Sequence, residues 1–179
     1  GGLIHVNVVG CGLFAAISGS SAATVATVGK MSIPELRKRK YPEKILLGSL
    51  AGSGTLGLLI PPSIILIIYG VTIEDSIAKL FMAGILPGIM LAVIFMLYVV
   101  IWSTINKKQM PIISENFSFL EKIKKSKQLL PVVLLITAVI GSIYTGIATA
   151  TEAASLGVVG ALILSLFQGT LNKNSFKLS

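Results

Sequence analysis

Long runs without charge are the feature that most constrains this chain. Such runs cover residues 45–73, 80–105 and 128–151, and another follows Glu152 as far as residue 170. A helix needs about 20 apolar residues to cross the hydrocarbon core of a bilayer, so each run has roughly the length of one span. Only 12% of the residues are charged, against about a quarter in soluble globular domains. We therefore expect an all-α membrane protein.

The positive charges predict which loops face the cytoplasm. Most of the 15 Lys and Arg residues lie in two blocks, 30–44 and 107–127. Basic residues concentrate in cytoplasmic loops, and placing both blocks there leaves Lys79 as the exception. The membrane thus accounts for the net charge of +8, and no nucleic-acid partner is expected.

These patterns divide the chain into eight segments. They are a re-entrant hairpin (1–29), a cytoplasmic basic loop (30–44), a broken transmembrane helix (45–71), a periplasmic loop (72–79), a transmembrane helix (80–103), a cytoplasmic amphipathic arm (104–128), two further helices (129–169) and a cytoplasmic tail (170–179).

The hairpin prediction depends on a polar interruption at Ser18, Gly19, Ser20 and Ser21. About 9 apolar residues follow it, too few at 1.5 Å per residue to cross a core of about 30 Å. Two short helices meeting at a polar tip would enter the membrane and return. The alternative is a kinked span whose small residues pack against neighbouring helices.

The second interruption has the sequence GSGTLGLLIPPS and occupies residues 52–63. Its two prolines have no amide donors and end the preceding helix. Irregular backbone at membrane depth survives only when it is buried in protein or lines a cavity, and broken helices hold the substrate and ion sites of many secondary transporters. Unwound carbonyls and hydroxyls suit Na⁺. The candidate binding residues here are Gly52, Ser53, Gly54, Thr55, Gly57, Pro61, Pro62 and Ser63.

Other readings of the polar residues are less favoured. The spacing of Gly52, Gly54 and Gly57 matches the GxGxxG pattern of dinucleotide sites, but that pattern needs a helix that continues for several turns. His5 and Cys11 are expected to be packing residues, since no metal-ligand spacing surrounds them. Without a catalytic constellation, the chain is not expected to be an enzyme, and neither a cofactor nor a transition metal is predicted.

A third polar cluster contains Thr149, Thr151 and Glu152. A carboxylate at membrane depth suggests a functional site. A threonine that caps a helix, with Glu152 in its first turn, is the favoured interpretation because the helix dipole stabilises an anion there. Direct coupling of Glu152 to an ion or proton is the alternative.

Four stretches resemble one transporter family. They are "GGLIHVNVVGCGLFAAISGSSAATVATVG", "GSGTLGLLIPPSIILIIYGV", "LFMAGILPGIML" and "GIATATEAAS". In this order they are similar to the large membrane (permease) subunit of tripartite ATP-independent periplasmic (TRAP) transporters. The resemblance implies an inverted-repeat, elevator-type transporter of the bacterial cytoplasmic (inner) membrane. It also implies that Na⁺ drives the import of an organic acid such as a C4-dicarboxylate or sialic acid.

The resemblance further implies the partners and the site. A periplasmic solute-binding protein would deliver the anionic substrate, and a small membrane subunit would accompany the permease in the lipid bilayer. The hairpin tip and the interruption at 52–63 would together form one Na⁺ site.

The chain departs from the family pattern in two respects. Thr149-Ala150-Thr151-Glu152 stands where the family often has Thr-Pro-Thr-Glu. A second hairpin and a second proline interruption are absent, so we expect a partial subunit that does not transport alone. A permease of another class, such as an ABC permease, and a purely structural membrane scaffold are the alternatives.

Overall fold

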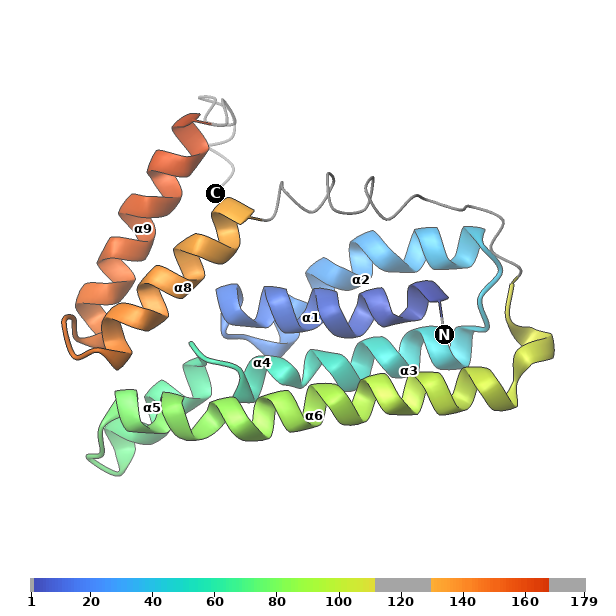
Figure 1. The fold of residues 1–179 in the computed structure, drawn as a ribbon, viewed down its shortest axis with the longest axis horizontal. Helices are drawn as coiled ribbons and strands as arrows, with labels where there is room; N and C mark the ends of the chain where they lie inside the picture. The colour runs from blue at the N-terminus through green and yellow to red at the C-terminus, as the bar shows by residue number, and fades with distance from the viewer. Residues whose placement is uncertain (1, 112–129, 168–179) are drawn as a thin grey trace. The chain divides into compact units, whose positions relative to one another are not determined.

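The computed structural model describes residues 2–111 and 130–167, and all regular elements in this part of the chain are helices (Figure 1). The all-α prediction is therefore confirmed. Two compact units divide between Asn116 and Phe117, and each is described by itself. Two helical stretches, Glu43–Thr72 and Ile77–Ile105, are long and apolar enough to cross a membrane. Membrane re-entry and elevator motion remain predictions.

The first unit consists of helices that pack along one another. They are η1 (Gly2–Ile4), α1 (His5–Ser18), α2 (Ser21–Lys38), α3 (Glu43–Gly54), α4 (Leu56–Leu59), α5 (Ile64–Thr72), α6 (Ile77–Ile105) and η2 (Lys107–Gln109). Helix α1 contacts α2, α3, α4 and α6, so it lies at the centre of the unit (Figure 1).

Helices α1 and α2 form a hairpin whose turn consists of Gly19 and Ser20. Gly19 has φ +59°, a left-handed conformation that ends α1 and that glycine adopts without strain. Ser20 is the N-cap of α2, and its hydroxyl oxygen accepts the amide of Ala23 at 3.4 Å.

The predicted basic loop at 30–44 is largely wrong, because α2 continues to Lys38. Its buried face repeats every four residues, at Thr24, Val28, Ser32 and Leu36, and so extends beyond the apolar run. Arg39 donates to the Glu35 carboxylate at 2.7 Å one turn earlier, and this bond lowers the pKa of Glu35 below its ordinary value. Within the range 30–44, only residues 39–42 lie outside helices.

The interruption predicted at residues 52–63 is narrower in the structure than expected. Residues 52–54 were expected to be unwound, yet they complete α3, and only Thr55 separates α3 from α4. Non-helical backbone is confined to residues 60–63, which contain the cis peptide bond between Pro61 and Pro62. The prolines break the helix as expected, whereas the glycines before them do not.

The remaining boundaries shift by a few residues. Residues 73–76 form the turn predicted at 72–79, and α6 exceeds its predicted range of 80–103 at both ends. The described residues of the second unit form two helices, α8 (Leu130–Tyr144) and α9 (Ala150–Phe167), within the range 129–169. Most of the predicted arm (104–128) and all of the tail (170–179) lie outside the described residues.

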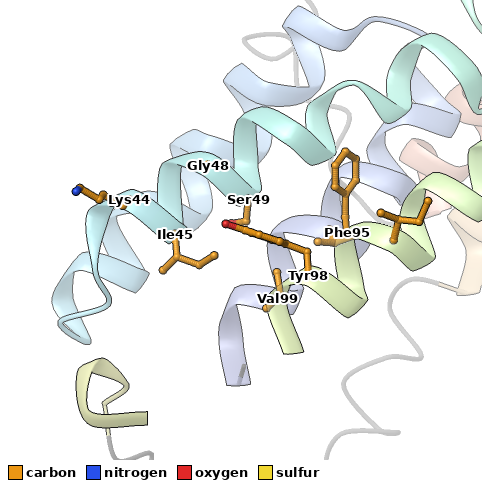
Figure 2. Close-up of a pocket in the computed structure, with 9 residues that line it drawn as sticks. Lys44, Ile45, Gly48, Ser49, Phe95, Tyr98 and Val99 are labelled. Atoms are coloured by element: carbon orange, nitrogen blue, oxygen red, sulfur yellow. The ribbon is translucent and has the colours of Figure 1, made fainter. Parts of the chain in front are cut away.

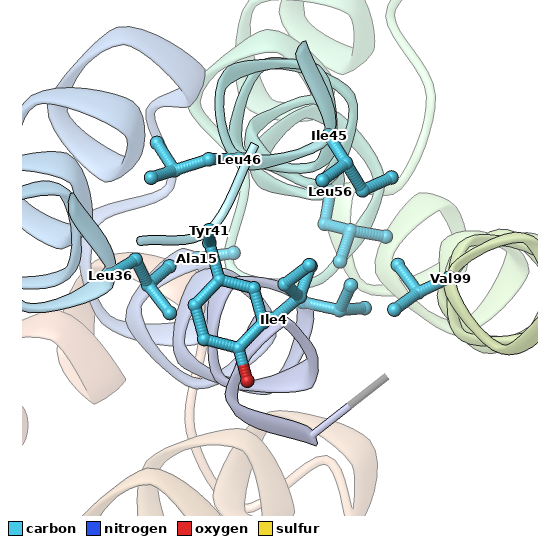
Figure 3. Close-up of a cluster of buried hydrophobic side chains, with 9 residues drawn as sticks. Ile4, Ala15, Leu36, Tyr41, Ile45, Leu46, Leu56 and Val99 are labelled. Atoms are coloured by element: carbon cyan, nitrogen blue, oxygen red, sulfur yellow. The ribbon is translucent and has the colours of Figure 1, made fainter. Parts of the chain in front are cut away.

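The core of the first unit lies where α1, α3 and the end of α6 meet. Buried side chains in this cluster include Ile4, Leu46 and Val99 (Figure 3). Asn7, also fully buried, donates from Nδ2 to the Leu46 carbonyl at 3.2 Å and to the Ser49 hydroxyl at 3.0 Å. Apolar burial and these hydrogen bonds therefore join α1 firmly to α3.

Two neighbouring leucines of α3 test this core. Leu46 is fully buried, whereas Leu47 is 43% exposed. We expect Leu46→Ala to lower the free energy of unfolding by about 2–5 kcal/mol, through lost burial and a residual cavity. Leu47→Ala should change it by about 0.5 kcal/mol or less. Thermal unfolding of the purified complete permease measures the difference, and equal losses would contradict this placement of the core.

Candidate functional site

A network of hydroxyls holds the hairpin tip in shape. Ser18 Oγ lies 3.0 Å from Thr24 Oγ1 and accepts the amide of Ser20 at 3.3 Å. Thr24 Oγ1 donates to the Ser20 carbonyl at 2.7 Å. The last residue of α1 and the first turn of α2 are thus joined through their side chains, which orders the turn between the two helices.

The interruption supplies its own replacement for a missing helical hydrogen bond. The carbonyl of Leu58 would receive the amide of residue 62 in a continuous helix, but proline has none. The buried Ser63 hydroxyl donates to this carbonyl instead, at 2.9 Å. In the same way, Pro61 deprives the Gly57 carbonyl of its helical donor. The proline pair therefore removes the helical amide donors of two carbonyls, and the Leu58 carbonyl accepts a side-chain hydroxyl instead.

The hairpin tip and the interruption meet directly. The amide of Ile64, the first residue of α5, donates to the Gly19 carbonyl at 3.1 Å. A Cβ added to Gly19 would lie 2.6 Å from the Pro62 carbonyl oxygen, and one added to Gly57 would lie 2.9 Å from the Ser21 amide nitrogen. Glycine is required at both positions because backbone approaches backbone there.

Helix α6 closes the opposite side of the interruption. A Cβ added to Gly84 would lie 2.6 Å from the Leu59 carbonyl oxygen, and one added to Gly88 would lie 3.1 Å from Ile60 Cγ1. These glycines, four residues apart, face the interruption from one side of α6. The irregular backbone is thus held between the hairpin tip and α6.

The predicted site residues of the first unit lie in different places: most gather at the junction, Gly54 lies one turn away, and the others face elsewhere. Those that gather at the junction of tip and interruption are Ser18, Gly19, Ser20, Ser21, Gly57, Pro61, Pro62 and Ser63. Gly54 packs against α2 one turn further on, where an added Cβ would overlap Val25.

The other three predicted residues face elsewhere. Gly52 faces Phe95 of α6, with 3.2 Å between an added Cβ and the ring. The Ser53 hydroxyl is buried and donates to the Ser49 carbonyl at 2.5 Å. Thr55 is exposed, and its hydroxyl donates to the Gly52 carbonyl at 2.7 Å. Helical hydrogen bonds within α3 therefore engage the two hydroxyls that were expected to line a site.

Sequence reasoning missed Thr24, Asn7 and the glycine pair of α6. Thr24 lies one helical turn after Ser20, a spacing that predicts contact with the tip. Asn7 is the one amide side chain in the uncharged segment 1–29, and such a residue needs a partner when buried. Gly84 and Gly88 have the four-residue spacing typical of close helix contacts in membranes.

In the second unit, Thr149 and Glu152 form a capping box. The Glu152 carboxylate accepts the Thr149 amide and hydroxyl, both at 2.8 Å, and the Thr149 hydroxyl oxygen accepts the Glu152 amide at 3.3 Å. Thr149 therefore caps α9. Thr151 makes a different contact, since its carbonyl accepts the Ser155 hydroxyl at 3.2 Å. Coupling of Glu152 to an ion or proton stays a prediction.

An apolar helix interrupted by irregular backbone is a feature of many membrane transporters. Comparison with known proteins identifies the family to which this chain belongs. The sequence pattern of the family "Tripartite ATP-independent periplasmic transporter, DctM component" matches residues 1–178. The chain belongs to this family of transporter permeases.

Several curated relatives match nearly all of this chain, but the match covers less than half of their own length. The C4-dicarboxylate TRAP transporter large permease protein DctM of Pseudomonas aeruginosa is 41% identical over 167 residues, which are 93% of this chain and 38% of that protein. An ectoine/5-hydroxyectoine TRAP permease, UehC of Ruegeria pomeroyi, is 37% identical over 93% of this chain and 38% of its own length. The sialic acid TRAP permease SiaM of Vibrio cholerae is 35% identical over 99% of this chain and 40% of its own length. The chain thus spans about two fifths of these relatives.

The junction makes a specific prediction for Gly19→Ala. The left-handed φ costs a residue with a Cβ about 1–2 kcal/mol, and the contact with the Pro62 carbonyl adds about 1–3 kcal/mol of overpacking. Gly146→Ala is the matched control, because Gly146 has φ +73° but open space around an added Cβ. Thermal unfolding of the complete permease should show the larger loss for Gly19→Ala. Equal losses would mean that the tip does not press on the interruption.

The capping box predicts different outcomes for its two members. Thr149→Ala should destabilise α9 by about 1 kcal/mol, through loss of the cap. Glu152→Gln should retain stability, because glutamine also completes a capping box, and should leave uptake by the complete permease unchanged. Uptake by the complete permease in vesicles checks the second expectation. Loss of uptake with unchanged stability would instead favour coupling through Glu152.

Proposed function

We propose that this chain is part of a sodium-coupled secondary transporter subunit that imports an organic acid by an elevator mechanism. The observation that carries this proposal is the junction between the hairpin tip and the interrupted helix, where the Ile64 amide donates to the Gly19 carbonyl. Two helices, α2 and α5, begin at this junction, at Ser21 and Ile64. Helix N-termini favour anions, so a carboxylate is the group that this junction suits.

The hydroxyl and carbonyl oxygens around the junction are suitable ligands for Na⁺. Ser18 donates its hydroxyl hydrogen to the Ser20 carbonyl and Ser63 donates to the Leu58 carbonyl, so both hydroxyl oxygens keep lone pairs for a cation. The Gly57 carbonyl, which has no amide donor at residue 61, adds a further oxygen. Hard cations prefer hydroxyl and carbonyl oxygens, and unwound helices of secondary transporters provide them. Bound Na⁺ would supply positive charge beside an anionic substrate.

Membership of the family supports the proposed partners and location. A periplasmic solute-binding protein would hand over the substrate, and a small membrane subunit would complete the transporter in the bacterial cytoplasmic membrane. The relatives carry names that specify C4-dicarboxylate, ectoine and sialic acid, and each of these molecules bears a carboxylate. The proposed substrate class is therefore a small carboxylate.

The elevator proposal is supported by how the elements pack. The hairpin, the interrupted helix and α6 contact one another through backbone at Gly19, Gly57 and Gly84. Separating the tip from the interruption would break these contacts and the hydrogen bond from the Ile64 amide to the Gly19 carbonyl. We therefore propose that the site moves across the membrane as one body together with its bound ion.

Ser18→Ala in the complete permease tests the sodium site. Removing a hydroxyl at the tip should raise the Na⁺ concentration that gives half-maximal uptake about tenfold, the scale of one hydrogen bond to a charged group. Uptake into proteoliposomes that contain the permease, its small subunit and the binding protein provides the measurement.

Thr104→Ala is the control for this experiment. Its hydroxyl is exposed near the end of α6 and donates to the Ile101 carbonyl at 2.7 Å, so the variant should retain the original Na⁺ dependence. An unchanged Na⁺ curve in Ser18→Ala would exclude the Ser18 hydroxyl from the sodium site. Uptake that persists after the Na⁺ gradient is collapsed would overturn the proposed sodium coupling.

A further inference from the structure

A groove of about 330 Å³ runs between α3 and α6, away from the junction described above. Its floor consists of Val8, Ile45, Ser49 and Val99, which are buried, and its rim includes the half-exposed Ile94 and Tyr98. Figure 2 shows Lys44 at one end of this row of residues and Phe95 at the other. The groove is therefore apolar along its length and basic at one end.

Gly48 keeps this groove open. An added Cβ there meets no heavy atom within 4 Å in the described part of the chain, so packing does not require glycine. In the interior of α3, glycine instead of alanine costs about 1 kcal/mol. The small residue leaves room for a group that the first unit does not itself contain.

The basic end of the groove coincides with the basic end of the unit. The end of α2, the start of α3 and the end of α6 lie together (Figure 1), and Leu36, Tyr41, Val99 and Met110 meet there in one cluster. Among the described residues at this end, both acidic side chains are paired, Glu35 with Arg39 at 2.7 Å and Glu43 with Arg37 at 2.8 Å. The lysines, among them Lys38, Lys40 and Lys44, therefore give this end a positive charge.

We propose that the groove binds an anionic phospholipid of the surrounding leaflet. One acyl chain would lie over Gly48 against Ile45 and Phe95, and the phosphate would lie beside Lys44. Basic pockets between membrane helices favour anionic head groups, and juxtamembrane lysines attract them. The charge distinguishes this occupant from a neighbouring apolar helix, which would gain nothing from Lys44. The inference rests on the membrane setting of the family and is independent of sodium coupling.

Lipid retention by the complete permease tests the proposal. The protein is purified from vesicles of three parts phosphatidylcholine and one part phosphatidylglycerol, and retained lipids are counted by native mass spectrometry. Gly48→Leu fills the groove and should remove one retained lipid per permease. Lys44→Gln should keep the groove but lower the preference for phosphatidylglycerol about fivefold, the contribution of one lysine near the surface.

Two matched variants control for bulk and for charge. Gly141→Leu adds the same side chain at a helical glycine that also has open space, and Lys79→Gln removes an exposed charge near the start of α6, outside the groove. Both should retain the original lipid count and preference. An unchanged count in Gly48→Leu would overturn the proposal. It would also be overturned if p-benzoylphenylalanine in place of Tyr98 cross-linked to another permease segment rather than to lipid.

Discussion

The proline pair at residues 61 and 62 is the constraint on which the first unit depends. Two consecutive residues without amide hydrogens deprive the Gly57 and Leu58 carbonyls of their helical donors. In a bilayer each unpaired backbone group costs several kcal/mol, so the chain must satisfy the interruption from within. The Ser63 hydroxyl satisfies one carbonyl, and the Gly19 carbonyl receives the amide that begins α5. The hairpin therefore completes the broken helix as well as packing beside it.

Close backbone contact explains the distribution of glycines better than flexibility does. Gly57 and Gly84 lie in helices, where glycine is unfavourable by about 1 kcal/mol relative to alanine. An added Cβ at either position would lie less than 3 Å from backbone atoms of a neighbouring element. The glycines thus allow the hairpin tip and α6 to approach the interruption, in which Pro61 and Ser63 are buried. A site built there would have a low dielectric constant, which strengthens the attraction between a cation and carbonyl oxygens.

Sequence reasoning predicted the helical class, the hairpin turn and the proline break because each follows from local chemistry. It placed Gly52, Ser53 and Gly54 in an unwound segment, which was wrong for a non-local reason. A glycine that breaks a helix and a glycine that admits a neighbour look identical until the neighbour is known. The length of α2 was underestimated for a similar reason, since Ser32 and Leu36 are buried by elements distant in the sequence. Asn7 escaped notice because its partners lie 39 and 42 residues further along the chain.

Helix α3 connects the two ends of the first unit. Its 12 residues extend over about 18 Å, from the lysine-rich end beside the groove to Gly54, which packs against α2. Asn7 and Ser53 bond α1 to α3 between these ends, with the Ser53 hydroxyl also 3.4 Å from the Asn7 carbonyl. A displacement at one end of α3 must therefore either break buried hydrogen bonds or be transmitted along α1 to the tip. Breaking them would leave polar groups unpaired in an apolar core, so movement of the helices together is the less costly response.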